Sequence, residues 1–250
     1  MKMKTKTLLI LSLVLVAISI GTIATINTQT QTNQSQGNSA TKEIDDAATP
    51  IVDFFGASVN TEQSRINKNA QYDNSRFVVS EPSPNTGEFI RSEGERSISD
   101  IPIEKSTVIL EGQVNDSKAF LSNDKSGVYS EFTIVVSKIL KNNSDDSLKS
   151  NEIIIGERFG GRVRYPSGKI IRYKISEQGS PSVNSKYLFF LSKTQSDGYK
   201  ILTAYELKNE KVFALDGART FPRSGEKTIF NKHDGQDYEN FISEIINRGE

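Results

Sequence analysis

The chain has 250 residues, with 31 lysines and arginines, 31 aspartates and glutamates, one histidine and no cysteine. This length allows one folded domain with tails. The lack of cysteine excludes disulfides, thiolate metal sites and cysteine-based catalysis. Three lysines and no acidic residue precede residue 27, which leaves 28 basic against 31 acidic residues in the rest of the chain. That balance excludes a globally basic nucleic-acid-binding protein.

The first 26 residues have the pattern of an export segment. Lys2, Lys4 and Lys6 precede an uncharged, mostly apolar run from Thr7 to Ile26. A positive start followed by an apolar run is typical of a signal peptide, and about 20 such residues can also span a bilayer as a helix. Residues 1–26 are therefore predicted to be an apolar helix, either a signal peptide or a single transmembrane anchor. The positive-inside rule places the rest of the chain extracytoplasmically, membrane-anchored or secreted.

Two stretches separate this segment from the main domain. Residues 27–49 are polar and lack periodicity, which predicts a disordered linker that acts as a tether. Residues 50–102 contain short apolar groups, with the turn formers Pro82, Pro84 and Gly87 between two of them. This composition predicts an extended arm or a hairpin, partly ordered, that lies on the main domain.

The main domain is predicted over residues 103–250. In the run from Val128 to Ile139, apolar residues alternate with polar ones such as Glu131, which indicates a half-buried strand. Further strands are predicted over residues 106–114, 152–159, 186–193, 199–207 and 211–215. Several short strands without helices between them predict a mainly β fold, an antiparallel OB-like barrel or sandwich.

A helix is predicted at the C-terminal end of this domain. Apolar residues recur there at helical spacing, namely Tyr238, Phe241, Ile242, Ile245 and Ile246. This spacing places one apolar stripe against the domain. Asp237 can cap the start of the helix, and Gly249 can end it.

The order of the strands supports a resemblance to known modules. The runs VILEGQV, VYSEFTIVVSKILK, NEIIIGE, SVNSKYLFFL and ILTAYEL follow one another between Ile103 and Leu207. This arrangement resembles the OB-type barrel of netrin-like and TIMP-like modules and is similar to cysteine-free exported bacterial proteins of unknown function. The animal families have cysteines that this chain lacks, including the N-terminal cysteine through which TIMPs inhibit metalloproteases. The resemblance therefore implies a fold and no inhibitory activity.

Catalytic and metal-binding patterns are missing from the sequence. The sole histidine, His233, precedes the predicted C-terminal helix, where a surface or capping position is favoured over a role as a catalytic base. Asn123 to Gly127 lacks the alternating acids and distal glutamate of a calcium loop and is predicted to be a turn. The sequence thus predicts no enzyme activity, no metal and no cofactor. A cell-envelope hydrolase without a recognisable motif is the alternative.

One stretch, ERFGGRVRYPSGKIIRYK from Glu157 to Lys174, is a candidate binding surface. Gly160 and Gly161 precede another predicted strand, which excludes a phosphate loop at a helix N-terminus. Tyr165 to Lys169 suits a three-residue hairpin loop with proline first and glycine in the left-handed position. That loop pairs Arg162 with Arg172 and separates an apolar face from a basic one.

The basic face consists of Arg162, Arg164, Arg172 and Lys174. Two like charges opposite each other are unfavourable, and a shared anion would relieve the repulsion. The other interpretation is a solvated face whose charges prevent aggregation of an edge or protruding hairpin. The sequence thus predicts an exported or membrane-anchored β-barrel module that binds an envelope component or a protein. Its expected partners are an anionic envelope polymer, lipid headgroups or an acidic protein, with no nucleic acid, and it contacts the membrane through residues 7–26 if these stay uncleaved.

Overall fold

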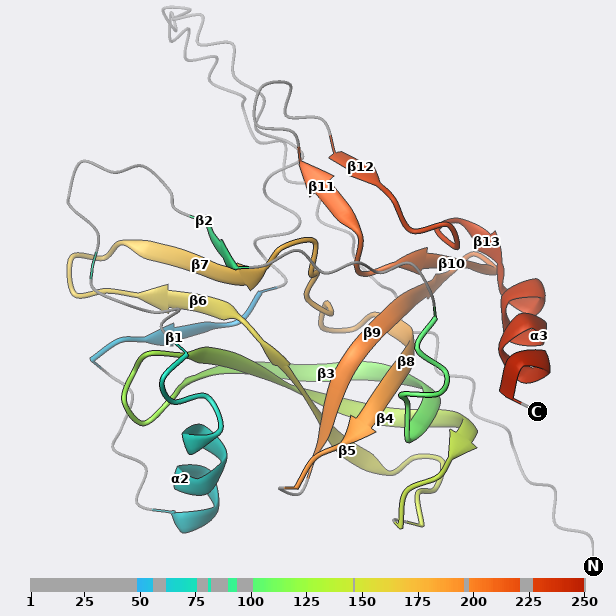
Figure 1. Cartoon of the computed structure of the whole chain (residues 1–250), viewed down its shortest axis with the longest axis horizontal. Coiled ribbons are helices and arrows are strands. Elements are labelled where there is room, and N and C mark those ends of the chain that lie inside the picture. The colour runs from blue at the N-terminus through green and yellow to red at the C-terminus, as the bar shows by residue number, and fades with distance from the viewer. Residues whose placement is uncertain are drawn as a thin grey trace, which may run out of the picture. The chain divides into compact units, whose positions relative to one another are not determined.

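The computed structural model describes most of the chain beyond residue 48 (Figure 1). The described residues are 49–55, 62–75, 81, 90–93, 101–145, 147–195, 198–220 and 227–249. They lie in one compact unit, Asn38–Glu250. The unit is mainly β, with antiparallel sheets and a C-terminal helix, as predicted. The signal peptide or anchor predicted over 1–26, and the linker predicted over 27–49 except for Thr49, fall outside the described residues.

The two longest strands form a hairpin, β3 (Val108–Leu121) and β4 (Val128–Asn142). Apolar side chains on one face of each strand are buried, and β4 is buried on both faces from Val128 to Phe132. Asp124 organises the connecting turn, because its carboxylate accepts hydrogen bonds from the Ser122 hydroxyl at 2.7 Å and the Ser126 N–H at 2.9 Å. The prediction of a turn at this place is confirmed.

Five strands of the larger sheet form a closed series of pairings. Besides β3 and β4, its members are β5 (Ile153–Phe159), β8 (Lys186–Lys193) and β9 (Tyr199–Lys208). β3 pairs with β4, β4 with β5, β5 with β9, β9 with β8, and β8 again with β3. The pairing of β5 with β9 is parallel and the others are antiparallel. β10 (Lys211–Ala214) and β13 (Gln236–Asp237) extend this sheet beyond β9.

A second sheet holds the hairpin that the sequence singled out. It consists, in spatial order, of β1 (Ile51–Asp53), β6 (Gly161–Arg164), β7 (Ile170–Ile175) and β2 (Ile90–Glu93). β6 and β7 are antiparallel, whereas β1 and β2 join them in parallel. The β6–β7 hairpin is antiparallel as predicted, and residues from before the main domain add the two outer strands in parallel. A third sheet pairs β11 (Ala218–Thr220) with β12 (Lys227–Ile229).

The C-terminal helix α3 (Tyr238–Gly249) has the predicted start and most of the predicted apolar stripe. Asp237 Oδ1 accepts a hydrogen bond from the Asn240 N–H at 3.1 Å, so the predicted cap is confirmed. Phe241, Ile242 and Ile245 are buried in a cluster with side chains of β8, β9 and β10. Ile246 is 51% exposed, so its predicted place in the buried stripe was wrong. The stripe is narrower than the sequence indicated, because helix α3 contacts the sheet along one line.

Residues 62–75 contain a short helix, α2 (Gln63–Ala70), that the sequence did not predict. Its sequence, QSRINKNA, has one large apolar residue and therefore no apolar stripe that would reveal a helix. Long polar side chains, not apolar ones, hold it against β4 and β5, as described below. The extended arm or hairpin expected over 50–102 stays a prediction, since much of that range lies outside the described residues.

Candidate functional site

The β6–β7 hairpin has the predicted register. Arg162 is opposite Arg172, and Val163 is opposite Ile171. The loop is closed by the Tyr165 N–H, which donates to the Lys169 carbonyl at 2.8 Å. Gly168 has a φ of 81°, the left-handed conformation that the sequence assigned to it. These predictions are confirmed because turn chemistry acts within a few residues.

The apolar face of the β6–β7 hairpin packs against the end of the β3–β4 hairpin that carries its turn. The buried cluster consists of Leu121, Val128, Val163, Tyr165, Ile171 and Tyr173. The hydroxyl groups of Tyr165 and Tyr173 are 2.6 Å apart, and Phe54 stacks on Tyr165 with a centroid distance of 5.1 Å. The sequence predicted that this hairpin has an apolar face and a basic face. The burial of these apolar side chains confirms the apolar face.

The four predicted basic residues lie in different surroundings. Arg164 is exposed, and its guanidinium is 3.2 Å from the carboxylate of Asp53 on β1. Arg172 is 7% exposed and lines a narrow cleft together with half-buried Lys174. Arg162 is half-buried and lines another, larger pocket. The hairpin is also interior to its sheet, so the edge position that the anti-aggregation interpretation considered was wrong.

The pocket beside Arg162 has a volume of about 570 Å³. We call it the β1–β3 groove; its lining residues are Thr49, Pro50, Ile51, Ser117, Lys118, Ala119, Phe120, Arg162, Ser182 and Val183. The two charged residues of this set, Lys118 and Arg162, are both cations. Val183 is 39% exposed, so an apolar surface accompanies the charges. A volume of a few hundred Å³ lined by apolar and polar residues together is within the range of ligand sites.

Arg162 is held in place at the groove by its inner nitrogen. Its Nε donates a hydrogen bond to the Thr49 carbonyl at 2.7 Å. Its two terminal nitrogens make no hydrogen bond with any residue in the described part of the chain. A guanidinium has five donors in a planar fork that matches a carboxylate or phosphate. The groove therefore presents an oriented donor pair to an anion.

A second pocket, of about 790 Å³, lies beside α2 and contains a network of charged side chains. Arg65 donates to both carboxylate oxygens of Glu131, at 2.6 and 3.0 Å. Lys68 Nζ lies 2.8 Å from Glu131 and 3.1 Å from Glu157. Glu131 and Glu157 face each other on β4 and β5. Two cations thus neutralise two buried carboxylates and fasten α2 to the sheet.

Glu131 has the wrong ionisation for acid catalysis. Burial would raise the pKa of Glu131, but hydrogen bonds from Arg65 and Lys68, together with their charges, hold it below its usual value. A general acid for glycoside hydrolysis needs a carboxyl whose pKa is raised. Burial next to Glu157 raises the pKa of Tyr72, which keeps that phenol neutral. The arrangement is suited to holding a helix and gives no support to the hydrolase alternative.

The alternation of β4 had suggested that Glu131 lies on a solvent-facing side of its strand, which was wrong. Glu131 is 9% exposed, because α2 covers this face of the sheet. The burial of Glu131 and the sharing of Lys68 between Glu131 and Glu157 were not predicted, because they depend on strand register and on α2, which are tertiary features. Their pairing had no signal in the sequence.

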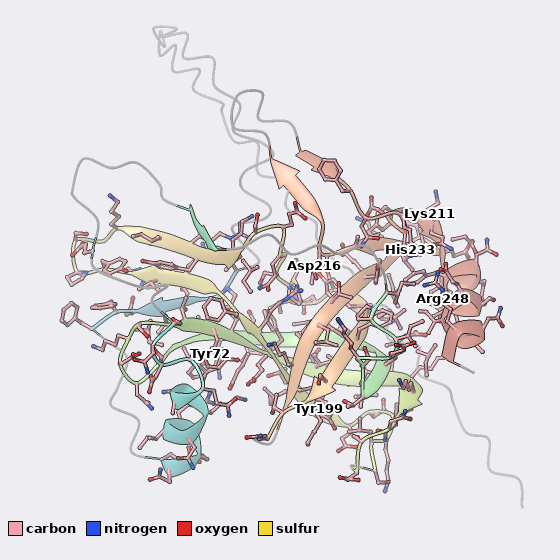
Figure 2. All side chains as sticks on the ribbon, viewed as in Figure 1. Tyr72, Tyr199, Lys211, Asp216, His233 and Arg248 are labelled. Atoms are coloured by element: carbon pink, nitrogen blue, oxygen red, sulfur yellow. The ribbon has the colours of Figure 1, made fainter. Side chains whose placement is uncertain are left out.

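The surface position expected for His233 was also wrong. Its side chain is 5% exposed and lies beside α3, as Figure 2 shows. The ring contacts Phe241, with centroids 5.2 Å apart, and Nδ1 lies 2.8 Å from Oε1 of Gln236. His233 is a core residue that lies in the turn preceding β13 and packs against helix α3. Its burial follows from the docking of the helix.

In the described ranges, no group of three or more histidine, cysteine or acidic residues is arranged to hold a metal ion. None of the helices in those ranges is long and apolar enough to cross a membrane. No protein-family model matches the chain, and no curated protein matches it in sequence.

Proposed function

We propose that this protein is an exported or membrane-anchored OB-like barrel module that binds an anionic ligand in the β1–β3 groove. The closed series of pairings through β3, β4, β5, β9 and β8 supports the barrel, since an OB module is a five-stranded Greek-key barrel. Three lysines before the apolar run from Thr7 to Ile26 support export. β5 and β9 share only two residue pairs, which is consistent with the partly open barrel of an OB module.

The arrangement of Arg162 carries the functional part of the proposal. Its Nε bond to Thr49 fixes the guanidinium at the groove, so that little side-chain freedom remains to be lost when a ligand binds. Lys118, whose side chain is 70% exposed, adds a second cation beside it and lies 3.4 Å from the carboxylate of Asp116. The ligand is an anion with an apolar part, as found in envelope polymers, lipids and acidic proteins. Arg164, Arg172 and Lys174 lie outside the lining of this groove and have supporting roles at most.

The test compares Arg162→Gln with wild type in the full chain. Glutamine removes the charge and the donor fork while it keeps much of the side-chain length. The probes are polyglutamate and vesicles that contain an anionic phospholipid, and the measurement is equilibrium binding at low salt. A charge-assisted hydrogen bond contributes about 1.5–3 kcal/mol, so at least one probe is expected to bind about tenfold more weakly or worse.

Arg164→Gln is the matched control, because Arg164 is on the same strand but pairs with Asp53 at the surface. This variant is expected to bind as wild type does. Added salt is expected to weaken binding of wild type more than that of Arg162→Gln, because fewer charges remain to be screened. Equal affinity of Arg162→Gln and wild type for both probes would refute the groove as an anion site.

A further inference from the structure

We infer that the β1–β3 groove takes an extended, acidic polypeptide segment, which adds a strand to the open edge of β3. This inference rests on the proposed function, because it names the class of partner that occupies the proposed anion site. It requires an unpaired strand edge at the groove, main-chain groups that point out of that edge, and charge that selects the partner. Each is present among the described residues.

Among the described residues, no strand is hydrogen-bonded to the edge of β3 that faces the groove. β8 pairs with β3 only from Val108 to Gln113. Beyond this, Val114 still exchanges hydrogen bonds with Asn184 and Ser185. From Asp116 to Leu121, β3 pairs within the described part of the chain with β4 alone. In the part of the chain that the structure describes, one edge of this half of β3 is therefore unpaired.

Hydrogen-bonded and non-hydrogen-bonded residue pairs alternate along the β3–β4 hairpin. This alternation shows which residues direct their main-chain N–H and C=O groups to the unpaired edge. Ser122 donates to Gly127 at the turn, so this pair is hydrogen-bonded, and every second pair along the hairpin is hydrogen-bonded as well. Ser117 and Ala119 belong to the intervening pairs, so their N–H and C=O groups point away from β4. The Ser117 N–H instead donates to the carboxylate of Asp116 at 2.9 Å.

These outward groups are at the groove. Ser117, Lys118, Ala119 and Phe120 all line it, and the opposite wall begins with Thr49 to Ile51 (Figure 1 shows β1 beside β3). Main-chain donors and acceptors at strand spacing match another extended polypeptide, which can bond to successive outward residues. Neither a lipid headgroup nor a glycan chain offers N–H and C=O groups at that spacing.

The charges of the edge select for acidic side chains. A bulge follows Val114, and Asp116 and Lys118 then place charges on the edge strand. Such features suppress pairing with arbitrary strands. Asp116 already pairs with Lys118 at 3.4 Å, so Arg162 leaves one net positive charge among these three residues. A strand with acidic residues offsets that charge, whereas a basic one adds like charge. The edge is thus expected to disfavour pairing with most extended segments and to favour pairing with an acidic one.

The experiment uses the full chain and a probe peptide of alternating valine and glutamate residues. Two isomeric probes are N-methylated, one on every valine and the other on every glutamate. Because N–H groups of successive residues point to opposite edges of a strand, only one isomer loses the hydrogen bonds to β3. We expect the unmodified peptide and one isomer to bind with similar affinity and the other isomer to bind at least tenfold more weakly. Hydrogen exchange of the Ser117 and Ala119 amides is expected to slow on binding.

The outcomes separate the inference from the proposed function. If both isomers bind like the unmodified peptide, exchange at Ser117 and Ala119 is unchanged and Arg162→Gln abolishes binding, the groove is an anion site without strand addition and the inference is wrong. Binding of anionic vesicles but not of the peptide also overturns the inference. If Arg162→Gln leaves binding of every probe intact, the proposed function itself fails.

Discussion

At the scale of single residues, Arg158 and Asp216 form an ion pair that is almost completely removed from solvent. Their side chains are 3% and 0% exposed. Asp216 also accepts hydrogen bonds from the Gly179 N–H at 2.9 Å and the Thr203 hydroxyl at 2.8 Å, so both carboxylate oxygens are satisfied (Asp216 is labelled in Figure 2). Burying two charges is costly, and the pair is stable only while each partner remains. The pair joins β5, β9 and the loop before β8.

Asp216→Asn is expected to lower the free energy of unfolding by about 3–5 kcal/mol, because it leaves the charge of Arg158 buried without a counter-charge. Asp53→Asn is the matched control, since Asp53 pairs with Arg164 at the surface, where the two side chains are 55% and 48% exposed. The control is expected to change stability by less than about 1 kcal/mol. Urea unfolding at neutral pH measures both, and equal effects of the two substitutions would contradict the role of Asp216.

At the scale of elements, α3 is fastened by one line of apolar side chains. Ile245 is 4% exposed and belongs to the cluster that includes Phe190 and Tyr205. The next residue, Ile246, is 51% exposed. A helix of 12 residues is marginal by itself in water, so this packing is what stabilises it. Ile245 is therefore expected to contribute more than the adjacent Ile246 to the free energy of unfolding.

Ile245→Ala is expected to destabilise the protein by about 2–5 kcal/mol, because it removes buried methyl groups and leaves a cavity. Ile246→Ala carries the same chemical change at an exposed position and is expected to cost less than about 1 kcal/mol. Chemical denaturation with circular dichroism measures both variants. A larger loss for Ile246→Ala than for Ile245→Ala would show that the helix docks through another face.

At the scale of the whole molecule, the network of Arg65, Lys68, Glu131 and Glu157 joins segments that are far apart in the chain. It connects α2 with two neighbouring strands, and Tyr129 extends it by accepting from Arg65 at 3.0 Å and donating to Asn69 at 2.7 Å. The pKa of Glu131 is lower in the folded protein than its ordinary value, for the reasons given above. The stability of the whole unit therefore depends on pH.

Because folding lowers the pKa of Glu131, its carboxylate stabilises the fold above the ordinary glutamate pKa of about 4.3. This stabilisation is lost as the pH falls below that value and through the folded-state pKa. Glu131→Gln is expected to be less stable than wild type at pH 7, since Arg65 and Lys68 lose a counter-charge. It is also expected to lose less stability on acidification. Urea unfolding over a pH series measures this, and parallel curves for the two proteins would contradict it.

The limits of prediction from the sequence are visible in the candidate site itself. Pro166 and Gly168 determine a turn by their own backbone preferences, so the pairing of Arg162 with Arg172 was predictable. The same pattern could not show that Arg172 is buried while Arg162 borders a groove, because that depends on Thr49 and β3, which are distant in sequence. The barrel itself and the location outside the cytoplasm stay predictions.

By itself, the sequence determined the strand periodicity, the hairpin loop and the cap and buried side of α3, because each follows from interactions among residues a few positions apart. Only the tertiary structure decided that α2 covers Glu131, that His233 is a core residue and that the open edge of β3 borders the groove with Arg162. Those features arise where distant segments meet. Neither a residue's type nor its local period says which other segment of the chain will cover it.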